Sequence, residues 1–175
     1  MVAFFYFDFA ARLEQSPTSV LSSLLKQVVR GLGEIPAKVV RAFRDQEKII
    51  GGRNPGLGEI VEMLQDISSS QCTFICIDAL DECIPEHRGK LLDSLSQILR
   101  KSPETRVFLA GRLHIRDEVE KHLRGRVMAV SITPAKDDII RFLRAKLKED
   151  TTPDAIDKIL EEDIVKAIPE TFSEM

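Results

Sequence analysis

The chain alternates short apolar runs with longer segments in which apolar residues recur every three or four positions. Apolar runs of four to eight residues are typical of buried strands, and the three-to-four spacing is typical of amphipathic helices. The runs predict strands at residues 2–9, 73–80, 106–110 and 127–132. Because strands alternate with helices, the pattern predicts an α/β fold with a mostly parallel sheet.

The helical segments are bounded by proline, serine and glycine, which commonly start or end helices. The spacing predicts helices between Ser16 and Gly31, between Pro36 and Gly51, over residues 57–67, 91–99 and 115–123, and after the Thr-Pro pairs at 133–134 and 152–153 as far as residues 147 and 164.

The strand at residues 73–80 is continuously apolar and ends in an acidic turn. Continuous apolarity favours a parallel strand that is covered on both faces. Its end carries Asp78, and Asp81 and Glu82 follow within four residues. Ligands of open α/β sheets bind beyond the carboxyl ends of the strands, and a charge at the end of a buried strand needs a compensating partner.

A magnesium ion with a phosphate behind it would be such a partner, because magnesium takes oxygen ligands and needs only one or two carboxylates. The spacing places Asp78 to hold the ion and Asp81 or Glu82 to orient or polarise an attacking water. The alternative is a strand end that is capped by a solvated acidic turn.

Composition excludes several classes of protein. Of the 175 residues, 43% are hydrophobic and 30% are charged, which is a globular balance. The net charge of −3 gives no electrostatic case for nucleic acid or for an anionic membrane surface. Three cysteines without a secretory signal favour a reducing compartment, and we expect the cytoplasm.

Residues 77–83 (Ile-Asp-Ala-Leu-Asp-Glu-Cys) resemble the Walker B segment of NACHT-type P-loop ATPases in the STAND class. The resemblance is strongest to the nephrocystin-like group of fungal receptor-like proteins. Residues 2–9 resemble the strand that follows the P-loop helix, residues 22–27 the next helix, and residues 106–112 the sensor strand. The resemblance extends from residue 2 to about residue 172.

The resemblance implies a role for each residue of the acidic turn and for one arginine. Asp78 would hold magnesium, and Asp81 and Glu82 would support the water or the metal. The sensor strand of the family usually ends in Thr-Ser-Arg-Pro, and only Arg112 matches here. Arg112 would therefore sense the γ-phosphate.

A P-loop itself is absent from the sequence. The motif Gly-x-x-x-x-Gly-Lys-Ser/Thr cradles phosphates with backbone N–H groups. Gly89 and Lys90 match the Gly-Lys pair of the motif. However, Leu91 stands where the motif has Ser or Thr, and Ile84 stands where it has its first glycine. The resemblance then implies a partial NACHT domain at residues 1–150 whose central P-loop strand is missing, and a following helical region that starts at residues 151–175.

The family's strand order is fifth, first, fourth, third, second, so the missing first strand would leave a gap between the fourth and fifth strands. We expect no ladder across that gap, marginal stability, and self-association through the open strand edges.

The expected function is that of a fragment of a nucleotide-binding switch domain. ATP and magnesium would bind only with an upstream P-loop segment, and downstream sensor repeats would be the other partner in a parent protein. Two alternatives stay open. One is a non-catalytic interaction remnant of the same fold, and the other is a magnesium-dependent phosphotransfer enzyme.

Overall fold

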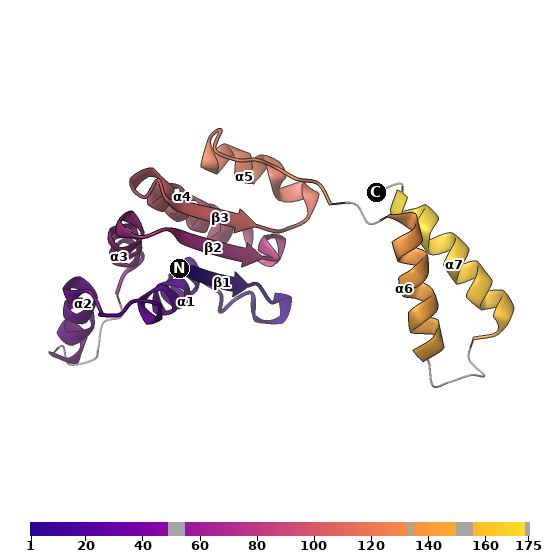
Figure 1. Ribbon diagram of the computed structural model, residues 1–175, viewed down its shortest axis with the longest axis horizontal. Helices are drawn as coiled ribbons and strands as arrows, with labels where there is room; N and C mark the ends of the chain where they lie inside the picture. Colours follow the sequence, from indigo (N-terminus) through magenta and orange to yellow (C-terminus); the bar gives the residue numbers. More distant parts are fainter. Residues whose placement is uncertain (49–54, 133–134, 150–155, 174–175) are drawn as a thin grey trace. The chain divides into compact units, whose positions relative to one another are not determined.

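The computed structural model describes residues 1–48, 55–132, 135–149 and 156–173 (Figure 1). It forms two compact units, Met1–Met128 and Ala129–Met175, and each is described by itself below. The domain boundary predicted at residues 150–151 lies outside the described residues, as do the Gly51 helix end and the two Thr-Pro helix starts.

The first unit is built on a parallel sheet of three strands, β1 (Val2–Tyr6), β2 (Thr73–Asp78) and β3 (Thr105–Leu109). Their order in the sheet is the same as their order in the chain. Helices flank this sheet, so the predicted α/β class with a parallel sheet is confirmed at this level, and three of the four predicted strands form (Figure 1).

The helices of the first unit share one hydrophobic core, which lies on one face of the sheet. Strands that are added in one direction, with right-handed crossovers between them, leave every connecting helix on the same face. The buried residues of the strands accordingly alternate with exposed ones. The helical elements of this unit are η1 (Phe9–Ala11), α1 (Pro17–Arg30), α2 (Ala37–Lys48), α3 (Leu57–Ser70), η2 (Leu80–Glu82), α4 (Pro85–Lys101), η3 (Leu113–Ile115) and α5 (Arg116–Leu123).

The hydrophobic core lies between the covered face of the sheet and helices α1, α3 and α4. Ile75 and Ile77 of β2 are 0–1% exposed and sit in this core. Each helix contributes a stripe of apolar residues at the spacing seen in the sequence. The apolar residues of α1, α3 and α4 that are 0% exposed are Val20, Leu21, Leu24, Val28, Leu64, Leu91, Leu92, Leu95 and Ile98.

The opposite face of the sheet is uncovered among the described residues, which corrects the prediction that both faces are buried. On β1, Phe4 is 66% exposed and Tyr6 is 62% exposed, and on β3, Phe108 is 59% exposed. The apolar run of β2 therefore does not report burial on both sides. The one-directional strand order explains this, because it sends no helix to the second face.

The strand predicted at residues 127–132 does not form in the described structure, which is a second correction. These residues have no ladder, and the only neighbour of β3 in the sheet is β2. Met128 is 88% exposed and Ile132 is 90% exposed. An apolar run becomes a strand only when a neighbouring strand takes up its backbone hydrogen bonds, and the described residues supply none here.

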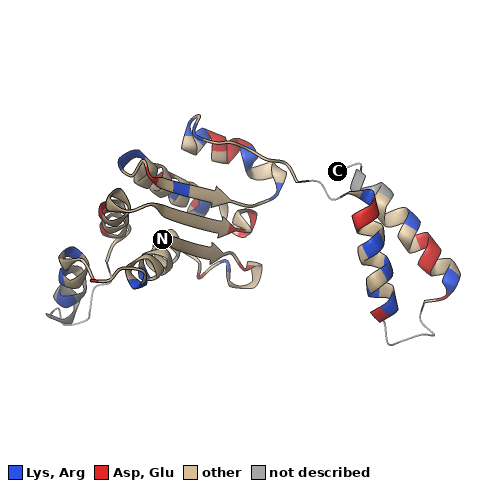
Figure 2. Ribbon diagram, in the orientation of Figure 1, with Lys and Arg blue, Asp and Glu red and all other residues tan. Residues whose placement is uncertain are grey.

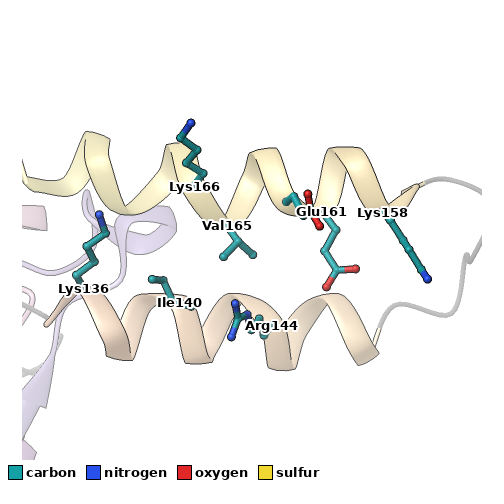
Figure 3. A pocket seen from close by; sticks show the side chains of 8 residues that line it. Lys136, Ile140, Arg144, Lys158, Glu161, Val165 and Lys166 are labelled. Carbon is teal, nitrogen blue, oxygen red and sulfur yellow. The ribbon is translucent and has the colours of Figure 1, made fainter.

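The second unit is a pair of helices, α6 (Lys136–Glu149) and α7 (Lys158–Ser173). Ile140 of α6 and Val165 of α7 point toward each other between the two helices, and Lys136 and Arg144 lie alongside (Figure 3). No residue of α6 is buried. In the described part of the chain, no helix combines the length and apolarity needed to cross a membrane.

Candidate functional site

The acidic turn begins where β2 ends, and the backbone bends sharply there. Asp78 is the last residue of β2, and Ala79 adopts the left-handed conformation with φ 52° and ψ 41°. The Ala79 N–H donates to Asp78 Oδ1 at 2.8 Å, and the Leu80 N–H donates to the Ala110 carbonyl at 2.9 Å. A left-handed alanine costs about 1 kcal/mol, so this turn is held in place by its hydrogen bonds to the end of β3.

Asp81 joins this turn to the segment that follows β3. Its Oδ1 accepts a hydrogen bond from the Arg112 backbone N–H at 3.2 Å, and its Oδ2 lies 3.3 Å from Arg112 Nε. The Asp81 side chain is 9% exposed, whereas the Arg112 side chain is 80% exposed. Asp81 therefore orients Arg112, and most of the guanidinium remains available to an anion.

The close approach of the two segments depends on Gly111. A Cβ at this position would lie 2.8 Å from Ile115 Cδ1 and 3.3 Å from Asp81 Oδ1. Because a real Cβ essentially never comes as close as 2.8 Å, a larger residue would shift the Ile115 side chain and crowd the Asp81 carboxylate.

All four residues singled out in the sequence lie at the carboxyl edge of the sheet. Asp78 is exposed, Glu82 is half-buried, and Asp81 and Arg112 are paired. The donor set suits magnesium, because the exposed Asp78 carboxylate offers oxygen at a strand end, and magnesium prefers oxygen ligands. Among the described residues, no group of three or more His, Cys, Asp or Glu side chains is placed to hold a metal ion.

Arg88 of α4 is a structural residue of this turn that the sequence reasoning missed. Its Nη1 donates to the Cys83 carbonyl at 2.9 Å and to the Asp81 carbonyl at 3.4 Å. Its Nη2 lies 2.7 Å from Glu118 Oε2 on α5, and its Nε donates to the same oxygen at 2.8 Å. The Arg88 side chain is only 9% exposed, so it ties the acidic turn to two helices.

A signal for Arg88 was present in the sequence. It lies three, four and seven positions before Leu91, Leu92 and Leu95, so the helical period places a charge on the apolar face of α4. A charge on a buried face needs a partner. Spacing alone does not identify that partner, because Glu118 is thirty positions away.

The environment of Cys83 is shaped by the same contacts. Burial raises the pKa of the Cys83 thiol from its ordinary value of 9.0 to about 11, the positive charge of Arg88 lowers it, and the negative charge of Glu118 raises it. Cys72 is exposed, Cys76 is half-buried and Cys83 is buried, and all three are free thiols. Cys83 therefore stays protonated at neutral pH and has a packing role in the turn.

A family model described as Nephrocystin 3, N-terminal matches residues 1–112, which include all three strands, the acidic turn and Arg112. No curated protein and no solved structure matches the chain.

Proposed function

We propose, from the premise that the chain belongs to the nephrocystin 3 N-terminal family, that it is part of a nucleotide-binding switch domain. The class we propose is the NACHT type of STAND P-loop ATPase, working in the cytoplasm. The observation that carries the proposal is the convergence of Asp78, Asp81 and Arg112 at the ends of two adjacent parallel strands. A carboxylate on one strand and a cation on the next suit a magnesium-bound phosphate chain.

The proposed roles of the four residues follow from how exposed their side chains are. Asp78 would hold magnesium, since its carboxylate is exposed at the strand end. Arg112 would contact the γ-phosphate through its exposed guanidinium, with Asp81 as the residue that positions it. Glu82 would orient the water. Bound magnesium and ATP would supply a phosphate group that is open to attack by that water.

A segment outside this sequence would supply the phosphate cradle. The chain has no P-loop motif, so in this proposal an upstream segment would supply the backbone N–H groups and the lysine that make most phosphate contacts. Downstream sensor repeats would be the second partner. The role of the chain is then to provide the magnesium ligand and the phosphate sensor of a shared site.

A direct prediction concerns the chain by itself. Without the P-loop, we expect calorimetry to give a dissociation constant for Mg-ATP no tighter than about 1 mM, or about −4 kcal/mol. Micromolar binding that disappears in the Asp78→Ala variant would contradict the need for a separate phosphate cradle.

The proposal itself is tested on a longer protein. The coding sequence upstream of Met1 should contain Gly-x-x-x-x-Gly-Lys-Ser/Thr in frame, and the extended protein should bind Mg-ATP in the micromolar range. Asp78→Ala and Arg112→Ala should each weaken that binding at least tenfold. Asp117→Ala, which removes an exposed carboxylate on α5, is the matched control and should leave it unchanged.

A second candidate is a non-catalytic interaction module of the same fold. The observation that favours it is the pairing of Asp81 with Arg112, which gives each charge one partner without a nucleotide. A stop codon upstream of Met1, with no P-loop in frame, would support this candidate over the switch domain.

A further inference from the structure

We infer that the uncovered face of the sheet docks a second copy of this chain, sheet against sheet. We call this surface the open face. It is formed by outward-pointing residues of all three strands, which pair in register across the sheet. The apolar side chains of the open face are Val2, Phe4, Tyr6, Phe74 and Phe108.

The open face is a continuous apolar surface. Its five large side chains are between 36% and 66% exposed, and they occupy neighbouring positions on adjacent strands. The rings of Phe74 and Phe108 stack with centroids 6.3 Å apart. Figure 2 shows that charge gathers on the helices and loops and is nearly absent from the strands. Single exposed apolar residues are common, but a contiguous patch of this kind marks an interaction site.

The area of the open face fits a dimer of small size. Free side chains of this class expose roughly 150–250 Å² each, so the observed exposed fractions correspond to about 430–720 Å² per copy. If the whole patch is covered, two copies would bury about 860–1,440 Å², a range that includes the lower limit of about 1,000 Å² for a specific interface. A sheet also suits another sheet in shape, because stacked sheets interdigitate their side chains at about 10 Å.

The charges at the ends of the open face favour one orientation. Arg106 pairs in register with Phe74 at the amino end of the sheet, and Asp78 pairs with Tyr6 at the carboxyl end. An antiparallel stack places Arg106 of one copy over the end that carries Asp78 in the second copy. A parallel stack brings like charges together, which costs free energy. We therefore assign the antiparallel, two-fold arrangement.

The open face is distinct from the open strand edges. An edge pairs through backbone hydrogen bonds, whereas the open face pairs through side chains. The inference concerns the 175-residue chain without nucleotide, so it does not depend on the proposed function.

The test is sedimentation equilibrium of the full chain from about 1 to 100 µM. We expect a monomer–dimer equilibrium that Phe4→Ser and Phe108→Ser each weaken at least tenfold. Leu13→Ser is the matched control, because Leu13 is 78% exposed and lies outside the strands, and it should leave the dimer unchanged. Circular dichroism of each variant confirms that the fold is kept.

A charge exchange tests the orientation. Arg106→Asp should weaken the dimer at least tenfold, and the double variant Arg106→Asp, Asp78→Arg should return it to within about threefold of the wild type. Loss of dimer with the two serine variants but no rescue by the exchange would overturn the antiparallel arrangement. A monomer at 100 µM would overturn the inference itself, since another occupant would then account for the exposed face. A dimer insensitive to both serine variants would also overturn it, since the strand edges would then account for the association.

Discussion

Gly111 is the residue on which the geometry of the acidic turn depends most directly. It lies between the end of β3 and Arg112, and a Cβ there would meet Ile115 and Asp81. The lack of a side chain lets the Arg112 backbone N–H reach the Asp81 carboxylate. A methyl group at this position would therefore crowd the contact between Asp81 and Arg112.

Gly111→Ala should lower the free energy of unfolding by about 1–2 kcal/mol, because the added Cβ crowds the buried Ile115 side chain. Urea denaturation measures this change. Gly58→Ala is the matched control: no atom lies within 4 Å of its added Cβ, and alanine in the first turn of α3 should raise stability by about 0.5 kcal/mol. Equal stability of the two variants would contradict the close approach at Gly111.

The raised pKa of the Cys83 thiol predicts that the free energy of unfolding falls at alkaline pH. The thiol has a pKa of about 11 in the folded chain, above its ordinary value of 9.0. The folded state therefore favours the neutral thiol. The contribution of this preference to the free energy of unfolding is complete below pH 9 and is lost as the pH rises toward 11. We expect wild-type stability to fall by about 2 kcal/mol more than that of Cys83→Ala over this range. Parallel pH profiles of the two proteins would contradict this.

The candidate site could be predicted from the sequence because its residues lie at strand ends. Asp78 closes an apolar run, and Arg112 follows another, so the parallel sheet places both at one edge. The pairing of Asp81 with Arg112 was not predicted. It depends on side-chain direction and on the absence of a Cβ at Gly111, neither of which the spacing reports.

At the scale of the elements, α4 and α5 are joined to the acidic turn by one buried ion pair. Arg88 donates to the turn carbonyls and to Glu118, and His122 of α5 also contacts Asp93 of α4 at 2.8 Å. The orientation of α5 is thereby coupled to the position of the turn.

Arg88→Met should lower the free energy of unfolding by about 2–4 kcal/mol, since Glu118 loses its cation and two carbonyls lose a donor. Urea denaturation measures the loss. Arg116→Met removes the pair with Glu120, whose side chains are 53% and 44% exposed, and should cost about 0.5 kcal/mol or less. Faster labelling of Cys83 by a thiol reagent in Arg88→Met alone would show that the turn has loosened.

The spacing of apolar residues predicts a helix or strand well when that segment pairs or packs in the fold, and poorly when it does not. The helices and β1, β2 and β3 follow the apolar spacing. Residues 127–132 have the composition of a strand but no neighbour among the described residues. The open face is equally invisible to pattern, because whether a second layer covers an apolar strand depends on the order of the strands in the sheet.

At the scale of the whole molecule, the described chain has one core. The core residues run from Ala3 to Leu123 and lie in the first unit, whereas Pro169 is the buried apolar residue among the described residues of the second unit. In the second unit, α6 has no buried residue, and Phe142 is 62% exposed. Two helices without a core are marginal in water.

The two units should therefore unfold at different urea concentrations. Circular dichroism reports all the helices, whereas the fluorescence of Tyr6, the only tyrosine in a chain without tryptophan, reports the sheet. We expect the helical signal to start falling before the Tyr6 signal changes. Coincident transitions would mean that the two units unfold as one.

The separation of β1 and β2 along the chain also determines how long β1 stays unpaired during synthesis. Val2 pairs with Phe74, which lies 72 positions later in the chain. Because ribosomes add about 5–20 residues per second, roughly 4–14 s pass between the synthesis of Val2 and that of Phe74. During that time residues 2–7, Val-Ala-Phe-Phe-Tyr-Phe, form an uncharged stretch without proline or glycine, the type that nucleates cross-β aggregates. Nascent chains of this protein are therefore at greatest risk in their aromatic segment before residue 74 has emerged.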